Sequence, residues 1–292
     1  MRLLHTFASL FLLVAFASPA TAQPADRRFT VTVEGSGPDV ILIPGLGSSA
    51  DVWNETAARI RTGHRVHRIQ IAGFAGAPAV ADDEGPVVAP LAEAIAAYIQ
   101  DQGLEAPAIV GHSLGGEAAL MIAARHPDRV GRVMTVDALP FYLLLFSPSA
   151  TVETSRPLAE SMRDGLLAQT PEQAEASTAV TVANMVGTEA ARPAVAAWTN
   201  ASDRSVLARA AYELLTTDLR PELGRISAPL TVIYAWDPRY GRPVEGIDTV
   251  FRSAYAGAPQ ARFERIDNSF HFIMLDQPEA FADAVARFLA GR

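Results

Sequence analysis

Brief apolar runs rich in β-branched residues recur along this chain. They occupy 40–43, 65–71, 108–110, 133–136 and 230–234, and end at Gly, Pro, Asp or Ser. Strands that are buried on both faces of a parallel sheet have this pattern. Two further strands are expected: 29–33, which alternates like an edge strand, and 262–266.

Segments with helical spacing separate these runs. They contain residues 56–61, 88–102, 116–125 and 278–289. Pro278 stands near the start of the last segment, where a helix tolerates proline. Strands that alternate with helices predict an α/β fold with a doubly wound, mostly parallel sheet.

The alternation stops between residues 139 and 226. This stretch is rich in Ala, Leu, Thr and Glu at helical spacing and contains no convincing strand. It is longer than one crossover requires. We therefore predict a helical cap insertion at 139–226, within an α/β core formed by 23–138 and 227–292. The apolar segment Phe141–Phe146 is expected to form the buried root of the cap; an acyl-binding or lipid-facing surface is the alternative.

The N-terminus has the pattern of an export signal. Arg2 precedes the apolar run Leu3–Phe16, and small residues follow at Ala20-Thr21-Ala22. This predicts a signal peptide at 1–22, cleaved before Gln23, and a periplasmic or secreted protein. An uncleaved anchor is the alternative. No later segment is long and apolar enough to span a bilayer.

Charge and composition narrow the function classes. The net charge is −8, and Lys and Arg form no clusters, which argues against nucleic acid as a partner. The chain has no cysteine, which excludes disulfides, thiolate nucleophiles and Cys-ligated metals. We find no metal-ligand spacing and no nucleotide-binding fingerprint, so we expect no cofactor and no metal.

The strongest chemical signal is Gly111-His112-Ser113-Leu114-Gly115-Gly116, which lies between the strand 108–110 and the helical segment 116–125. In this context the G-x-S-x-G pattern predicts a tight strand-to-helix turn that presents the Ser113 hydroxyl above the sheet. Gly111, His112 and Gly115 form the elbow around this nucleophile. The N-terminus of the following helix favours negative charge that develops there.

A serine nucleophile needs a base, and few histidines are available. In this topology the base follows the serine and the acid in sequence, which leaves His126 and His271. His126 lies at the far end of the helix after Ser113. His271 lies in a loop after the expected strand 262–266 and before the last helix, so we predict it as the base.

Two aspartates compete for the acid. Asp237 and Asp137 each end a predicted strand at its carboxyl end, where catalytic groups gather in open α/β sheets. Either could orient His271 and stabilise its imidazolium. We favour Asp237 and keep Asp137 as the alternative.

The oxyanion of a tetrahedral intermediate needs backbone donors. The N–H of Leu114 is one candidate, because it directly follows the nucleophile. The second is expected from the Gly-rich loop 43–48, and we choose the N–H of Leu46.

At these residues the chain resembles the α/β-hydrolase superfamily, over nearly all of its length after the leader. It looks most similar to small esterase-like and haloperoxidase-like serine hydrolases with a helical cap. The resemblance places the acid after the strand that carries Asp237. It excludes epoxide hydrolases and haloalkane dehalogenases, which have Asp where this chain has Ser113. Two departures are Pro44-Gly45, where His-Gly is common, and Phe270, where Gly often precedes the histidine.

We therefore expect a serine hydrolase that cleaves a carboxylic ester or related acyl bond of a small-molecule substrate through an acyl-enzyme. C–C bond hydrolysis, perhydrolysis, peptidase and lyase activity on the same residues are alternatives. A non-catalytic binding protein is a further one.

Overall fold

The computed structural model describes residues 27–291. The expected signal peptide at 1–22 and its cleavage site lie outside the described residues.

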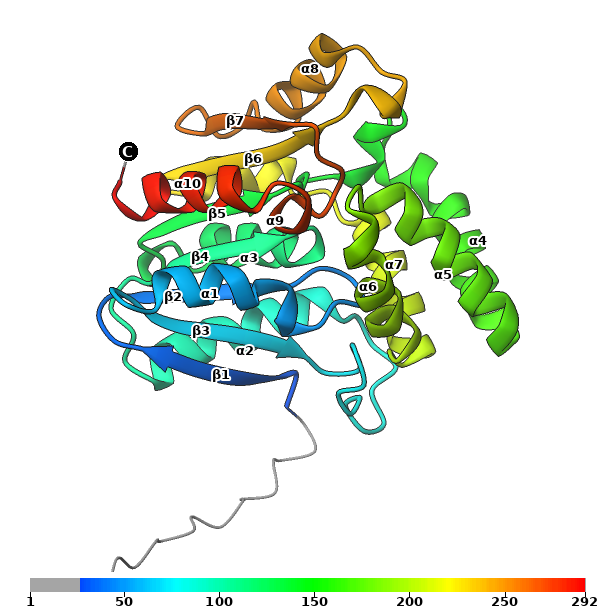
Figure 1. The fold of residues 1–292 in the computed structure, drawn as a ribbon, viewed down its shortest axis with the longest axis horizontal. Helices are drawn as coiled ribbons and strands as arrows, with labels where there is room; N and C mark the ends of the chain where they lie inside the picture. The colour runs from blue at the N-terminus through cyan, green and yellow to red at the C-terminus, as the bar shows by residue number, and fades with distance from the viewer. Residues whose placement is uncertain (1–26, 292) are drawn as a thin grey trace, which may run out of the picture.

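The described part of the chain is built on a seven-stranded sheet with strand order β1-β3-β2-β4-β5-β6-β7 (Figure 1). β1 is antiparallel to β3, and all other neighbours are parallel. The strands are β1 Phe29–Gly35, β2 Asp39–Ile43, β3 Arg65–Ile71, β4 Ala108–His112, β5 Arg132–Val136, β6 Leu230–Trp236 and β7 Arg262–Asp267. The carboxyl ends of the parallel strands therefore meet at one edge of the sheet.

Helices cover both faces of this sheet (Figure 1). α1 and α10 pack on one face, and α2, α3 and α8 pack on the other. Alternate residues of β2 point into the two opposite cores, as the twofold repeat of a strand requires: Val40 and Leu42 into one, Ile41 and Ile43 into the other. The helices are α1 Asn54–Ile60, α2 Val88–Asp101, α3 Leu114–Arg125, α8 Val244–Ala254, α9 Ile273–Asp276 and α10 Pro278–Leu289.

The chain between β5 and β6 forms four α-helices that stand beyond the carboxyl edge of the sheet (Figure 1). They are α4 Val152–Ala168, α5 Pro171–Met185, α6 Arg192–Asn200 and α7 Arg204–Thr216. Thr151 and Thr170 start α4 and α5 with reciprocal side-chain and backbone hydrogen bonds, which satisfy N–H groups that a helix start leaves free. α4 packs against α7, and α5 packs against α6. We call this unit the cap.

The predicted fold class is confirmed: the sheet is mostly parallel, helices cover both faces, and a helical insertion interrupts the alternation. Four strands, β1, β4, β6 and β7, continue past their expected carboxyl ends. β4 continues to His112 and β6 to Trp236, so each strand reaches the residue directly before a candidate catalytic side chain.

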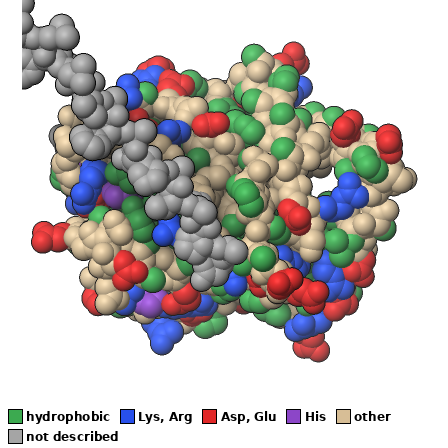
Figure 2. Space-filling model, turned by 90° about the horizontal axis from the view of Figure 1, so that it is seen from below, with side chains coloured by type: hydrophobic (Ala, Val, Ile, Leu, Met, Phe, Trp, Pro, Cys, Tyr) green, Lys and Arg blue, Asp and Glu red, His purple; other side chains and the backbone are tan. Residues whose placement is uncertain are grey.

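The surface shows no strong segregation of charge on the face seen in Figure 2, where acidic and basic side chains are intermixed. Within residues 27–291, no helix has the length and apolar character needed to cross a membrane.

Candidate active site

Ser113 lies at the sharp turn between β4 and α3. Its backbone has φ 53° and ψ −123°, a conformation that costs energy for a residue with a side chain. The Ser113 N–H donates to the carbonyl oxygen of Val136 at 3.0 Å, which anchors the turn to β5. The expected elbow is therefore present, with its strain held by the neighbouring strand.

The glycines around Ser113 are required by close backbone contacts. A Cβ atom at Gly111 would lie 2.1 Å from the carbonyl oxygen of Gly115, and one at Gly115 would lie 2.3 Å from the carbonyl oxygen of Ile43. A Cβ at Gly116 would meet Ala138 at 2.4 Å. Larger side chains at these positions would push apart the turn, the loop after β2 and the chain leaving β5.

His271 lies next to this elbow, in the loop between β7 and α9. Its ring centroid is 4.6 Å from that of His112, the residue before Ser113. His112 is fully buried, and its Nε2 donates to the backbone carbonyl of His271 at 3.0 Å. Burial and the neighbouring His271 hold the pKa of His112 well below its ordinary value, so His112 stays neutral. His112 thus fixes the backbone of the predicted base.

In the structure, the carboxylate that contacts His271 belongs to Asp137. Nδ1 of His271 and Oδ2 of Asp137 are 2.6 Å apart, and both side chains are mostly buried. The other oxygen, Oδ1, accepts the Ala235 N–H at 3.0 Å. With Nδ1–H donating to Asp137, the unprotonated Nε2 of His271 is available as a base. Asp137 has φ 47°, a second strained position held by its hydrogen bonds.

Our first choice of acid, Asp237, is not the partner of His271. Both of its carboxylate oxygens face Arg239 instead: Nε donates to Oδ1 and Nη2 to Oδ2, each at 2.8 Å, and the Arg239 N–H also donates to Oδ1 at 2.8 Å. The hydrogen bonds from Arg239 lower the pKa of Asp237. The guanidinium of Arg239, two residues further along the chain, therefore pairs with the carboxylate predicted as the acid from its position at the end of a strand. The alternative that we kept, Asp137, contacts the histidine.

The oxyanion loop adjoins the elbow. A Cβ at Gly45 would lie 3.1 Å from Cβ of Ser113, which places the loop after β2 directly against the nucleophile. Leu46 follows in this loop, and Leu114 is the first residue of α3. Neither N–H forms a hydrogen bond with another group of residues 27–291. Both predicted donors remain available to an oxyanion.

The cap packs against this loop at Gly47 and against the loop after β3 at Gly73 and Ala75. A Cβ at Gly47 would come 3.1 Å from Leu207, and one at Gly73 would come 2.7 Å from Val206, both on α7. The Ser202 hydroxyl accepts the Ala75 N–H at 2.8 Å. The junction of α6 and α7 therefore covers the oxyanion side of the site.

Two buried polar groups near Ser113 were not found from the sequence. The Tyr142 hydroxyl contacts Ser113 without an aligned hydrogen bond and has no partner within residues 27–291. Glu117, one turn into α3, is 1% exposed, and neither carboxylate oxygen has a partner there. Burial raises the pKa of both groups well above their ordinary values, and Glu213 adds to the effect on Glu117. The one feature of the sequence that pointed to either group is the tyrosine within the otherwise apolar segment Phe141–Phe146.

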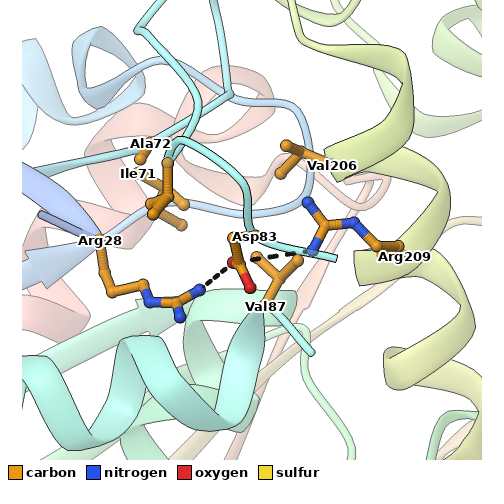
Figure 3. Close-up of a pocket in the computed structure, with 8 residues that line it drawn as sticks. Arg28, Ile71, Ala72, Asp83, Val87, Val206 and Arg209 are labelled. Carbon is orange, nitrogen blue, oxygen red and sulfur yellow. Dashed lines mark hydrogen bonds and ion pairs between the residues drawn. The ribbon is translucent and has the colours of Figure 1, made fainter. Parts of the chain in front are cut away.

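A small recess lies elsewhere, between the end of β3 and cap helix α7 (Figure 3). Asp83 pairs there with Arg28 and, at 3.7 Å, with Arg209. Ser113, His271 and Asp137 do not line this recess. Its ion pairs fasten the loop after β3 to the cap.

No cluster of metal-ligating side chains occurs among the residues that the structure describes.

Comparison with known proteins agrees with this architecture. Pimeloyl-[acyl-carrier protein] methyl ester esterase of Aeromonas hydrophila is 27% identical over 278 residues, covering 89% of this chain and 99% of that protein. The protein with the same name in Chromobacterium violaceum is 30% identical over 207 residues, covering 68% and 76%.

Solved structures show the same fold. The enol-lactonase of Burkholderia xenovorans LB400 superposes with a TM-score of 0.72 at 20% identity, covering 90% of this chain and 96% of that one. A bromoperoxidase from Bacillus anthracis gives a TM-score of 0.74 at 17% identity, covering 89% and 94%.

The model of the alpha/beta hydrolase family matches residues 40–284, which include the elbow, both aspartates and His271. The chain therefore belongs to the α/β-hydrolase family, as an enzyme that resembles carboxylic ester hydrolases.

Proposed function

We propose that this enzyme hydrolyses carboxylic esters of a small-molecule substrate through an acyl-enzyme on Ser113, with His271 as base and Asp137 as acid. The observation that carries the proposal is the 2.6 Å contact between His271 Nδ1 and Asp137 Oδ2, beside a serine on a strained elbow. This contact selects the tautomer that leaves Nε2 free to accept a proton.

The reaction follows from these positions. Ser113 Oγ attacks the ester carbonyl carbon while His271 Nε2 takes the hydroxyl proton. The N–H groups of Leu46 and Leu114 stabilise the resulting oxyanion, and one such donor typically contributes on the order of 10²–10³ in rate. Asp137 stabilises the imidazolium.

The intermediate collapses when His271 returns the proton to the leaving alcohol. The alcohol departs and Ser113 remains acylated. Water then attacks the acyl carbon while His271 again takes a proton, and collapse of the second intermediate releases the carboxylic acid and regenerates Ser113.

The curated relatives support an ester with a small alcohol group. Their names describe esterases that act on the methyl ester of a pimeloyl group carried by an acyl-carrier protein. Methyl and other short-chain alkyl esters are therefore the substrates to test first, and an acyl-length series would define the acyl side.

We also propose that the enzyme acts in the periplasm or after secretion. The charged start, the apolar run Leu3–Phe16 and Ala20-Thr21-Ala22 support this proposal. Peptide mass spectrometry of protein recovered from the periplasm or medium should find an N-terminal peptide that begins at Gln23, as glutamine or its cyclised pyroglutamate form. Retention of residues 1–22 would contradict cleavage.

The activity proposal is tested by covalent labelling. A fluorophosphonate should label the wild-type protein, and peptide mass spectrometry should place the label on Ser113. Ser113→Ala should lose both labelling and ester hydrolysis. Full labelling of Ser113→Ala, or no labelling of the wild type, would overturn the proposal.

A further inference from the structure

Asp276, the last residue of α9, joins the cap to the loop that carries His271. Oδ2 accepts the N–H of Phe270 at 2.8 Å and the N–H of Gly187 at 2.9 Å, and Oδ1 accepts the N–H of Thr188 at 2.8 Å. One carboxylate therefore binds the residue directly before the base and two residues of the cap.

Further contacts at this junction join the same two segments. The Phe272 N–H donates to the carbonyl oxygen of Met185 at 3.2 Å, and the Thr188 hydroxyl donates to that of Leu275 at 3.3 Å. The backbone on both sides of His271 is thus bonded, directly or through Asp276, to the turn between α5 and α6.

Gly187 allows the carboxylate to approach. A Cβ at Gly187 would lie 2.9 Å from Oδ2 of Asp276, closer than a real Cβ tolerates. Its φ is not positive, so its backbone does not itself demand glycine. Glycine at position 187 therefore leaves the space that the Asp276 carboxylate occupies.

These contacts connect two parts of the molecule with different tasks. The cap covers the oxyanion loop and must admit substrate, whereas His271 must stay aligned with Ser113. An error of about 1 Å in the position of a catalytic group can cost on the order of 10² in rate. A rigid link between cap and base therefore has consequences for catalysis.

We propose that Asp276 is a positioning residue that makes the alignment of His271 depend on the seating of the cap. The inference rests on the proposed function. When the turn at Gly187 and Thr188 is docked, the carboxylate holds Phe270 and with it the start of the His271 loop. When the turn moves away, Asp276 loses its two charge-assisted hydrogen bonds to the cap, the carboxylate that holds Phe270 is no longer fixed, and the base loses its alignment.

The chain offers a matched control in Glu213 on α7. Its carboxylate also accepts three backbone N–H groups across the boundary between cap and core, from Val87 at 2.6 Å, Val88 at 2.7 Å and Ala89 at 2.8 Å. These belong to the start of α2, not to the His271 loop. Glu213→Gln therefore removes a carboxylate that joins cap and core in the same way, but at the start of α2 and away from the His271 loop.

The experiment compares Asp276→Asn with Glu213→Gln. For each folded protein, measured well below its melting temperature, it determines the fluorophosphonate labelling rate and kcat and KM on p-nitrophenyl acetate. Asp276→Asn should lower the labelling rate and kcat by about 10- to 100-fold and change KM by less than about threefold. Glu213→Gln should lower the melting temperature while leaving the labelling rate within about threefold of wild type.

A second variant probes the same contact from the cap. Gly187→Ala leaves the carboxylate intact but crowds it, and should lower kcat in the same direction as Asp276→Asn. Wild-type labelling rates in both Asp276→Asn and Gly187→Ala would overturn the inference, as would an equal loss in Glu213→Gln. If the wild type itself fails to react, the proposed function falls and the inference falls with it; slow variants beside a reactive wild type support both.

Discussion

The ends of β5 and β6 present the same sequence pattern and serve different purposes. Each strand closes with an aspartate at the carboxyl edge of the sheet, Asp137 after β5 and Asp237 after β6. Asp137 contacts Nδ1 of His271, whereas Asp237 is paired on both oxygens with Arg239. β5 is the immediate neighbour of β4, so its aspartate lies one strand nearer to the nucleophile.

This difference shows that position on the sheet is not sufficient to assign a catalytic acid. The carboxylate must also be free of a permanent cation and within reach of the histidine loop. Asp237 does not meet the first condition, because the guanidinium of Arg239 donates to both of its carboxylate oxygens. Among residues 27–291, the Asp137 carboxylate accepts one backbone N–H, from Ala235, and its other oxygen contacts His271.

The largest expected effect tests the acid directly. Asp137→Asn should reduce kcat for ester hydrolysis by about 10³- to 10⁴-fold, because an amide no longer selects the Nδ1–H tautomer or stabilises the imidazolium. Steady-state kinetics on p-nitrophenyl acetate measures this loss. Circular dichroism should show that the fold is retained. Activity within tenfold of wild type would contradict the role of Asp137.

A smaller effect is expected from the matched substitution after β6. Asp237→Asn should leave kcat within about threefold of wild type, since the side chain does not contact His271. It should lower stability, because Arg239 loses its anionic partner. The pKa of Asp237 is lowered in the folded state, so its contribution to stability is present above the ordinary value of 3.8 and is lost as the pH falls.

Thermal melts of wild type and Asp237→Asn should therefore differ most at neutral pH and converge in acid. A kcat loss comparable with that of Asp137→Asn would reverse the comparison and restore Asp237 as the acid.

The smallest effect concerns Glu117, which lies below the elbow and is not assigned to the reaction. Burial, then Glu213, raise the pKa of Glu117 well above 4.5, so the folded protein retains a proton that the unfolded chain loses. Stability from this group is complete below the ordinary pKa and declines as the pH rises. Glu117→Gln cannot lose that proton, so its melting temperature should rise relative to wild type between pH 5 and pH 8. A difference that does not change with pH would contradict the buried, protonated state.

The sequence predicts most of the fold because local signals agree with it. The runs at 65–71 and 278–289 coincide with β3 and α10, since apolar spacing, turn residues and Pro278 all indicate the same boundaries. Ser113 and His271 could also be predicted as nucleophile and base, the first from a local motif with steric requirements, the second from chain order and the small number of histidines, and the structure places the His271 loop against the elbow.

The acid could not be identified in this way. Its identity depends on Arg239 folding back on Asp237 and on the loop of His271 reaching past β6 to the end of β5. The first contact is local but depends on the side-chain conformation of Arg239, and the second is a tertiary contact between residues 134 positions apart, Asp137 and His271. The contacts of Asp276 and Glu213 could not be predicted either, because their partners are backbone N–H groups, which every sequence contains at nearly every position.

In the proposed site, Asp137 holds the proton of His271 Nδ1 and so directs Nε2 to Ser113. Proton NMR of the imidazole N–H resonances in wild type, Asp137→Asn and Asp237→Asn tests this most directly, with His271→Ala assigning the signal. We predict a downfield Nδ1–H resonance in wild type and Asp237→Asn that is lost or strongly shifted upfield in Asp137→Asn. Retention of this resonance in Asp137→Asn together with its loss in Asp237→Asn would contradict the account.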